Sequence, residues 1–288
     1  MSELKGLGVA MVTPFKANKE VDFVALEKLT NYLIDGGLDY LVVMGTTGES
    51  ATLNREEQQK ILDTVSRINA NRIPLVFGIG GNNTIAMIET YNSYNLEGVS
   101  AILSASPYYN KPSQEGIYQH YKYLAEHMNH DIILYNVPGR TASNMTAATT
   151  VRLAKDFDNI IAIKEASGDI TQVMHIINNR PDNFLVISGD DALTLPMIAC
   201  GADGLISVIA NSHPELTKSM VSDALNNDYK GSRDSHYQLL ELIDAIFADG
   251  NPAGVKVLLN KIGIMQNEVR LPLVPVNKKL ESQLRKMI

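Results

Sequence analysis

Eight short apolar runs alternate with amphipathic helical patterns, which predicts an α/β protein whose strands close into a (β/α)8 barrel, the TIM-barrel architecture. The main alternative is a doubly wound open sheet. The eight units are regular and no break in composition divides them, which favours closure. The chain has 288 residues, enough for one large α/β domain with a small addition.

The expected strands are runs rich in Val, Ile and Leu, as in parallel strands buried on both faces. In order, they cover residues 6–12, 40–44, 75–79, 99–103, 132–137, 160–163, 184–187 and 204–208. Between them the apolar positions recur with a helical period. The expected helices cover residues 23–35, 55–68, 84–96, 114–127, 146–155, 170–179 and 193–200.

The pattern changes after the eighth strand. Three consecutive helical patterns follow without an intervening strand, and a last helix is expected near the end of the chain; they cover 214–225, 229–248, 253–262 and about 278–287. We therefore expect two domains, a catalytic barrel over residues 1–226 and a small C-terminal helical domain over residues 227–288.

Composition excludes several classes of function. The chain has 25 Lys and Arg against 32 Asp and Glu, a net charge of −7 without a basic face, so we expect no nucleic-acid partner. Cys200 is the single cysteine, which indicates a reducing compartment. Neither a secretory signal nor a membrane span is expected, so we predict a cytoplasmic protein without a membrane partner.

Sequence signals for a cofactor are weak. The segment GIGGNN at residues 78–83 begins like a dinucleotide fingerprint, but Asn83 occupies the place of the third glycine. The six histidines show no spacing typical of metal ligands. We therefore expect neither a metal ion nor a nucleotide cofactor.

Lys164 follows the apolar run 160–163, at the carboxyl end of a strand that the pattern predicts to be buried. One interpretation is a strand-end lysine whose amine extends to solvent along its aliphatic stem. The other is a desolvated amine that forms a Schiff base with a carbonyl substrate. The other strand ends decide between them, because active sites of such barrels form at the carboxyl ends of the strands.

The second expected strand ends in the turn GTTGES, residues 45–50. Its two glycines allow a ligand to approach the backbone closely, and Thr46 and Thr47 supply hydroxyl and N–H donors. Such a turn, leading toward a helix, suits an anion such as a carboxylate. A plain turn between a strand and a helix is the alternative.

Two further loops carry polar side chains. The segment SPYYNKP at 106–112 places Tyr108 and Tyr109 on a loop stiffened by prolines, and packing at a subunit contact is the alternative for them. The seventh strand ends in SGDD at 188–191, whose aspartates we expect to cap the next helix.

The fifth strand leads into YNVPGRT at residues 135–141. This segment offers the Tyr135 phenol near the barrel mouth and the Arg140 guanidinium, which could bind a carboxylate with two hydrogen bonds. A surface position is the alternative for Arg140. Hydroxyls, a phenol, a lysine and an arginine at one barrel mouth together suit carbonyl chemistry on an anionic substrate.

In combination, these segments resemble the pyruvate-dependent Schiff-base aldolase family. The similarity extends over essentially the whole chain and rests on five motifs, which are GTTGESATL at 45–53, PYYNKP at 107–112, YNVPGRT at 135–141, IKEA at 163–166 and SGDD at 188–191.

The resemblance implies a covalent Schiff base between pyruvate and Lys164, and no other cofactor. It implies that Thr46 and Thr47 hold the pyruvate carboxylate, and that Ile206 lines the site from the eighth strand.

The resemblance further implies a proton relay in which Tyr135 acts together with Thr46 and with Tyr109 of a neighbouring subunit. Arg140 would bind the carboxylate of the second substrate. Members of the family are usually homotetramers built from tight dimers.

Within the family, Thr46, Thr47 and Arg140 indicate condensation of pyruvate with aspartate 4-semialdehyde, a step of lysine and diaminopimelate biosynthesis. The alternative is N-acetylneuraminate lyase or another 2-keto acid aldolase. The lyases tend to read Ser-Thr-Gly-Glu in the turn and lack an arginine matching Arg140. A catalytically silent barrel is the alternative from another class, and the intact set of site residues argues against it.

Lysine-regulated relatives carry an inhibitory pocket at the dimer interface. This chain resembles them at Ser50, Ala51, Asn82 and Tyr108, but has Arg55 and Gln58 where they tend to have histidines, and Ala86 where they have a glutamate. An ammonium group buried without a carboxylate partner binds poorly. The resemblance therefore implies weak or absent inhibition by free lysine.

Overall fold

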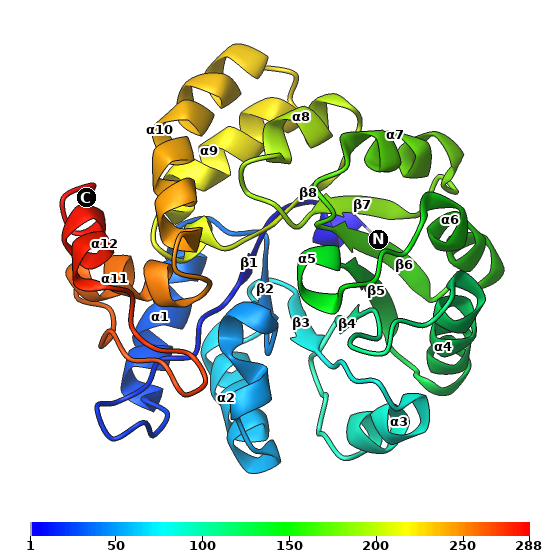
Figure 1. Cartoon of the computed structure of the whole chain (residues 1–288), viewed down its shortest axis with the longest axis horizontal. Coiled ribbons are helices and arrows are strands. Elements are labelled where there is room, and N and C mark those ends of the chain that lie inside the picture. Colours follow the sequence, from blue (N-terminus) through cyan, green and yellow to red (C-terminus); the bar gives the residue numbers. More distant parts are fainter. Residues whose placement is uncertain (1) are drawn as a thin grey trace.

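The computed structural model describes residues 2–288, so Met1, which the expected barrel domain includes, lies outside the described residues. A closed barrel of parallel strands in sequence order forms the centre, which confirms the predicted (β/α)8 architecture (Figure 1). Its strands are β1 (Gly6–Ala10), β2 (Tyr40–Val43), β3 (Leu75–Gly78), β4 (Ala101–Ala105), β5 (Asp131–Asn136), β6 (Ile160–Glu165), β7 (Leu185–Ser188) and β8 (Gly204–Ser207).

Helices surround the barrel and continue beyond it. They are α1 (Phe23–Asp35), α2 (Arg55–Asn69), α3 (Thr84–Asn92), α4 (Gln114–His127), α5 (Pro138–Thr141), α6 (Ala147–Asp156), α7 (Ile170–Asn179), α8 (Thr194–Ala199), α9 (Pro214–Leu225), α10 (Tyr229–Phe247), α11 (Ala253–Lys261) and α12 (Lys278–Leu284).

Three local differences from the expected elements concern the barrel mouth. β6 continues through Lys164 to Glu165, so the lysine is part of the strand ladder. The segment Pro138–Thr141 forms the short helix α5, which the sequence pattern did not predict. The turn after β2 contains two 3-10 helices, Thr46–Gly48 and Ser50–Thr52.

Two apolar layers hold the barrel together. Side chains on one face of the strands, among them Val42, Val76 and Ile133, fill the barrel interior, and Leu4 packs against this inner layer. Side chains on the other face join the helices in one large cluster, which is the outer layer. Because both strand faces are buried, the strands read as continuous apolar runs.

Short polar side chains fix where most barrel helices begin. Each accepts a hydrogen bond from the backbone N–H of the third residue after it, which satisfies one donor that the first turn leaves unpaired. The residues that do this are Asp22, Asn54, Asn83, Ser113, Thr146 and Asp169. Because these caps directly precede the helices, they also determine the lengths of the loops at the barrel mouth.

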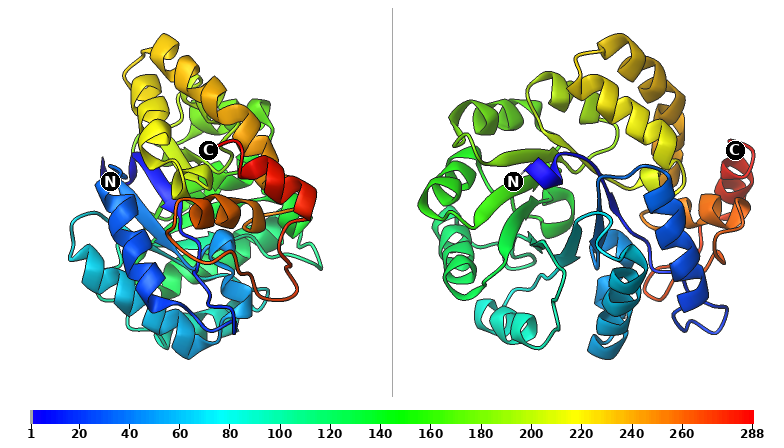
Figure 2. Two further views of the ribbon diagram at one scale, coloured as in Figure 1. Left: turned by 90° about the vertical axis from the view of Figure 1, so that its left-hand side faces the viewer. Right: turned by 180° about the vertical axis from the view of Figure 1, so that it is seen from behind.

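The C-terminal helices α10, α11 and α12 lie outside the ring of barrel helices, and the loop between α11 and α12 reaches the region of α1 and α2 (Figures 1 and 2). α9 packs against β1, and α10 packs along α9. We keep the division at residues 226 and 227 as a proposal, since it falls in the connection between α9 and α10.

Among residues 2–288, none of the helices combines the length and the apolar character needed to cross a membrane.

Closure of the barrel requires a glycine at position 204. Gly204 lies opposite Gly6 where β8 meets β1, and a Cβ atom there would lie 2.1 Å from the Gly6 carbonyl oxygen. Gly204→Ala should therefore destabilise the fold by roughly 3 kcal/mol or more, and lower the melting temperature by roughly 6 °C or more. Thermal unfolding followed by circular dichroism measures this.

Gly80→Ala is the matched control, because a Cβ atom at Gly80 would make only ordinary contacts, the nearest at 3.8 Å. Equal melting temperatures for both variants would show that the backbones of β1 and β8 can separate without cost.

Candidate active site

A cavity of about 870 Å³ opens at the carboxyl ends of the strands. Its walls come from the loop after β2, the ends of β3, β4 and β5, the loop after β4, and helices α2, α3 and α5. Three residues of the C-terminal segment, Asn251, Pro272 and Leu273, complete them. Of the residues proposed from the sequence, Thr46, Tyr135 and Arg140 line this cavity. Its position agrees with the rule that the loops after the strands carry the chemistry of such barrels.

Lys164 faces the barrel interior because of a bulge in β6. Ile161 is one extra residue relative to β5, and beyond it Lys164 stands opposite Tyr135 in the ladder. In an unbroken ladder Lys164 would stand opposite Asn136 and face the outer helices, because successive side chains alternate between faces. The bulge thus aims the lysine into the site, a common use of bulges.

The Lys164 amine lies next to the phenol ring of Tyr135. Lys164 is only 5% exposed, and its Nζ is 4.4 Å from the centre of the Tyr135 ring. Lys164 is therefore buried, so the solvent-extended interpretation is wrong, and formation of a Schiff base stays a prediction. The amine thus contacts a residue that lines the cavity, whereas Lys164 itself is not among the lining residues.

The neighbouring Glu165 faces the opposite side of β6 and fixes its end. Its buried carboxylate accepts hydrogen bonds from Asn136 Nδ2 at 3.0 Å, from Ser167 N at 2.7 Å and from Gln172 Nε2 at 3.0 Å. Burial raises the pKa of Glu165, and these hydrogen bonds oppose that shift. Because Asn136 follows Tyr135 on β5, the contact holds the strand pair that presents Lys164.

Gly189 leaves room for the lysine side chain. A Cβ atom at this position would lie 2.9 Å from Lys164 Cε and 2.8 Å from Ala166 Cβ. The glycine of the SGDD segment is therefore required by a close approach to the lysine stem.

The two aspartates of this segment do not cap α8, which corrects the expectation from the sequence. Asp190 accepts hydrogen bonds from the N–H groups of Ala192 and Leu193, in a turn before the helix. Asp191 is buried and accepts from Ser207 Oγ and from the N–H of Val208, so it joins the end of β7 to the end of β8.

The turn after β2 presents one threonine to the cavity and buries the other. Thr46 is exposed at the cavity wall, whereas Thr47 is 3% exposed and its hydroxyl accepts a hydrogen bond of 2.9 Å from Asn251 Nδ2. Glu49 has left-handed backbone angles, φ 54° and ψ 34°, and connects the two 3-10 helices. The turn therefore presents the Thr46 side chain at the cavity wall, whereas the Thr47 hydroxyl is held by Asn251.

Arg140 lies on α5, the short helix that follows β5 (Figure 1). The helix starts at Pro138, whose fixed φ suits a first helical residue. Thr141 is buried and donates a hydrogen bond of 2.7 Å to the Ser143 carbonyl oxygen, which holds the end of this short helix. Arg140 is exposed and lines the cavity, so its guanidinium can meet an anionic substrate.

Tyr108 and Tyr109 occupy different environments. Tyr108 lines the cavity, and its backbone is anchored by both groups of the Asn82 amide, at 3.1 and 2.9 Å. Tyr109 has a positive φ of 70°, is 86% exposed and does not line the cavity of its own chain. A phenol this exposed on a fixed loop is available to a second molecule.

Ile206 on β8 is buried in the inner layer together with Tyr135, and it is not among the residues that line the cavity. Within residues 2–288, no three His, Cys, Asp or Glu side chains lie close enough together to hold a metal ion.

Comparison with known proteins decides the family. Residues 3–288 match the model of the dihydrodipicolinate synthetase family. The chain belongs to this family. A relative from Parabacteroides distasonis, named 4-hydroxy-tetrahydrodipicolinate synthase, is 52% identical over 285 residues, which are 99% of this chain and 96% of that protein.

Solved structures agree with this assignment. The chloride-inhibited dihydrodipicolinate synthase from Acinetobacter baumannii, complexed with pyruvate, is 38% identical with a TM-score of 0.95, covering 99% of this chain and 97% of that one. The enzyme from Cyanidioschyzon merolae, with lysine bound, is 35% identical with a TM-score of 0.95 and the same coverage.

Sequence reasoning missed Asn251, which lies between α10 and α11 and lines the cavity from the C-terminal segment. Its Nδ2 reaches Thr47, whereas its buried Oδ1 has no hydrogen-bond partner within residues 2–288. A lone Asn-Pro pair between two expected helices reads as a turn, so the sequence offered no signal that could have found it.

Proposed function

We propose that this protein condenses pyruvate with aspartate 4-semialdehyde to give 4-hydroxy-tetrahydrodipicolinate, a step of lysine and diaminopimelate biosynthesis. The observation that carries the proposal is the buried Lys164 amine beneath Tyr135, next to a cavity lined by Thr46 and Arg140. Relatives at about half identity that carry the synthase name support the same reaction.

Lys164 Nζ attacks the ketone carbon of pyruvate, and loss of water gives a Schiff base. Loss of a methyl proton converts it to an enamine, whose carbon attacks the aldehyde of the second substrate. The amino group of that substrate then adds to the imine carbon and displaces Lys164, which closes the ring. One water is released overall, and the lysine itself accepts the electrons, so the chemistry needs no metal or organic cofactor.

The remaining groups bind carboxylates and move protons. Thr46 and Thr47 hold the pyruvate carboxylate, and Ile206 limits the space beside it. Tyr135 transfers protons to and from the reacting carbon and oxygen atoms through Thr46 and Tyr109.

Arg140 binds the carboxylate of the semialdehyde with two parallel hydrogen bonds. N-acetylneuraminate lyase activity is disfavoured, because Arg140 and the Thr46-Thr47 pair match the synthases. We further propose a cytoplasmic homotetramer built from tight dimers, in which Tyr109 reaches the cavity of the neighbouring chain.

The Schiff base is tested by substituting its lysine. Lys164→Ala should lower turnover by roughly 10³-fold or more, because no other group can form the covalent intermediate, while the melting temperature stays close to that of the parent protein. Borohydride reduction with pyruvate, followed by peptide mass spectrometry, should locate the adduct on Lys164.

Lys111→Met is the comparison variant, since it removes an exposed lysine on the tyrosine loop. It should retain a borohydride-stable adduct on Lys164. An adduct on Lys111 or Lys256 in the parent protein would contradict the proposal.

Sharing of Tyr109 between subunits is tested by mixing two inactive chains. Tyr109→Phe alone should lower turnover by roughly 10²–10⁴-fold, because proton transfer loses its phenol. Co-assembly with Lys164→Ala chains should restore activity, since each mixed dimer contains one site with both residues. For random two-fold pairing, recovery approaches about a quarter of the parent activity.

Verified mixed oligomers without any recovery would place Tyr109 outside a shared site. Mixtures of Tyr135→Phe and Lys164→Ala chains are the control, because Tyr135 lines the cavity of its own chain and mixing restores no complete site.

Free lysine should inhibit weakly or not at all. Arg55 lines the same cavity. Its Cζ lies 5.6 Å from the centre of the Tyr94 ring, and its Nη2 donates a hydrogen bond of 3.3 Å to Thr90 Oγ1. The one acid among the described lining residues is Glu49, which is already paired with Lys256. A lysine ammonium would therefore meet a positive charge and no free carboxylate.

Steady-state rates at millimolar lysine measure this inhibition. Strong, saturable inhibition would show that another acid reaches the pocket. Ala86→Glu is the matched variant, because it supplies the carboxylate found in lysine-regulated relatives and should increase inhibition.

A further inference from the structure

A buried ion pair lies beside the Thr46-Thr47 turn, outside the set of proposed catalytic residues. The side chains of Lys256 on α11 and of Glu49 in the turn are both 0% exposed, and they contact each other directly. Lys256 Nζ also donates to the carbonyl oxygens of Thr13 and Glu268, each at 2.8 Å. All three donors of this ammonium are thus used.

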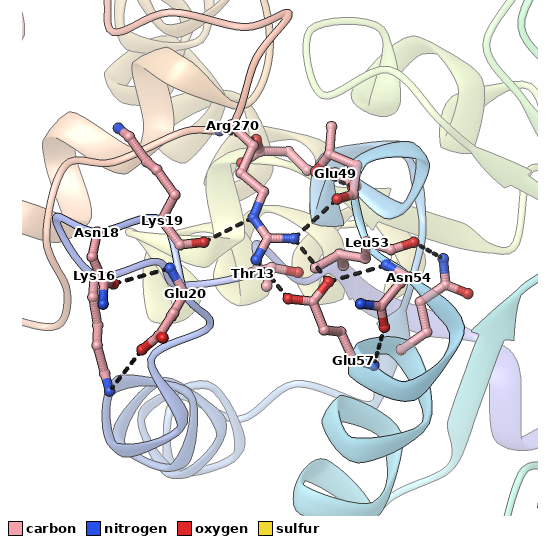
Figure 3. Close-up of polar contacts among 12 residues, drawn as sticks. Thr13, Lys16, Asn18, Lys19, Glu20, Glu49, Leu53, Asn54, Glu57 and Arg270 are labelled. Carbon is pink, nitrogen blue, oxygen red and sulfur yellow. Dashed lines mark hydrogen bonds and ion pairs between the residues drawn. The ribbon is translucent and has the colours of Figure 1, made fainter.

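The second oxygen of Glu49 binds the same C-terminal segment. It accepts a hydrogen bond of 3.0 Å from the backbone N–H of Arg270. The Arg270 guanidinium makes two hydrogen bonds to the Glu57 carboxylate, at 2.9 and 2.6 Å, and others to the carbonyl oxygens of Thr52 and Lys19 at 2.9 Å (Figure 3). We call Glu49, Lys256 and Arg270 the Glu49 clamp.

The Glu49 clamp acts on the turn from several sides. The carbonyl oxygen of Gly48 accepts a hydrogen bond of 2.6 Å from Thr13 Oγ1, and Thr13 is itself bound by Lys256. On the cavity side, Asn251 binds the Thr47 hydroxyl. The turn that offers its threonines to the ligand is therefore fixed by residues more than 200 positions away in the sequence.

Two physical features indicate that the clamp holds the turn after β2 in position and does not only stabilise the fold. A buried ion pair often adds little net stability, because both charges lose their hydration, although removal of one partner is costly. Glu49 also holds left-handed backbone angles, which are unfavourable for any residue with a side chain. Such a conformation persists only where its surroundings enforce it, and here the enforcing contacts come from the C-terminal segment.

We propose that Glu49 and Lys256 are positioning residues for the pyruvate site, and that the C-terminal segment thereby determines the affinity for pyruvate. Lys256 touches no substrate in this scheme. It fixes Glu49, which fixes the backbone and hydroxyl groups of Thr46 and Thr47. This inference rests on the proposed function, in which those threonines hold the pyruvate carboxylate.

The test measures the pyruvate concentration that gives half-maximal borohydride trapping on Lys164, without the second substrate. Glu49→Gln keeps the shape of the side chain but removes the charge that holds Lys256. It should raise the half-saturating pyruvate concentration about 10-fold, because a small displacement of positioning groups weakens binding strongly. The extent of trapping at saturating pyruvate should still reach that of the parent protein. This distinguishes a lower affinity for pyruvate from a smaller fraction of folded protein.

Arg180→Met is the matched control. It breaks a largely buried ion pair with Asp203 at the opposite, amino end of the barrel. This variant should lower the melting temperature and leave the half-saturating pyruvate concentration unchanged. The double variant Glu49→Gln/Lys256→Met should bind pyruvate no more weakly than Lys256→Met alone, since both residues act through one contact.

Folded Glu49→Gln protein with a lowered melting temperature but unchanged pyruvate dependence would overturn the inference and leave the pair purely structural. Arg270→Lys is the alternative variant if Lys256→Met does not fold. It removes the pair of hydrogen bonds to Glu57 and should raise the half-saturating pyruvate concentration by less than Glu49→Gln does. Failure of the parent protein to trap pyruvate on Lys164 would instead reject the proposed function, so the two failures are distinguishable.

Discussion

Lys164 and Tyr135 stand side by side because β5 and β6 pair in one particular register, and that register depends on the extra residue Ile161. In a parallel ladder, a shift of one residue transfers every later side chain to the other face of the strand. Without the bulge the amine would lie among the outer helices, and Glu165 would face the barrel interior. The chemistry at the barrel mouth therefore rests on a backbone irregularity as much as on the identity of any side chain.

Buried carboxylates hold this arrangement by joining neighbouring segments. Glu165 joins the ends of β5 and β6 through Asn136, Asp191 joins β7 to β8, and Glu49 joins the turn after β2 to the C-terminal segment. Burial raises the pKa values of Glu165 and Asp191, and multiple hydrogen bonds oppose the shift for each of them. Each carboxylate accepts hydrogen bonds from fixed N–H groups, so it resists relative movement of neighbouring strand ends.

The sequence contained most of the architecture, because strands buried on both faces and helices with polar caps leave strong local patterns. The apolar runs located every strand to within a few residues, and the motifs placed Thr46, Tyr135 and Arg140 at one mouth. The bulge was not predictable. In the run Ile-Ile-Ala-Ile every position is apolar, so no alternation marks the residue that is out of register.

Contacts between distant segments were equally hidden. A lysine such as Lys256, in an ordinary amphipathic helix, is predicted to lie on the surface. Only the fold reveals that it pairs with Glu49, 207 positions earlier in the sequence. The aspartates after β7 show the same limit. Asp191 matched a helix cap by its local spacing, yet its carboxylate bonds to β8, whose position no local pattern specifies.

Several residues with unfavourable backbone angles lie in the loops at the barrel mouth. Residues other than glycine with clearly positive φ occur in three of its loops, and they are Met44, Glu49, Tyr109, Lys111 and Ala142. Each such residue costs about 1–3 kcal/mol and persists only where other contacts exceed that cost. The loop after β2 meets this condition through the Glu49 clamp. The tyrosine loop has an anchor at Asn82 but leaves Tyr109 86% exposed, and contact with a neighbouring subunit would stabilise its backbone conformation.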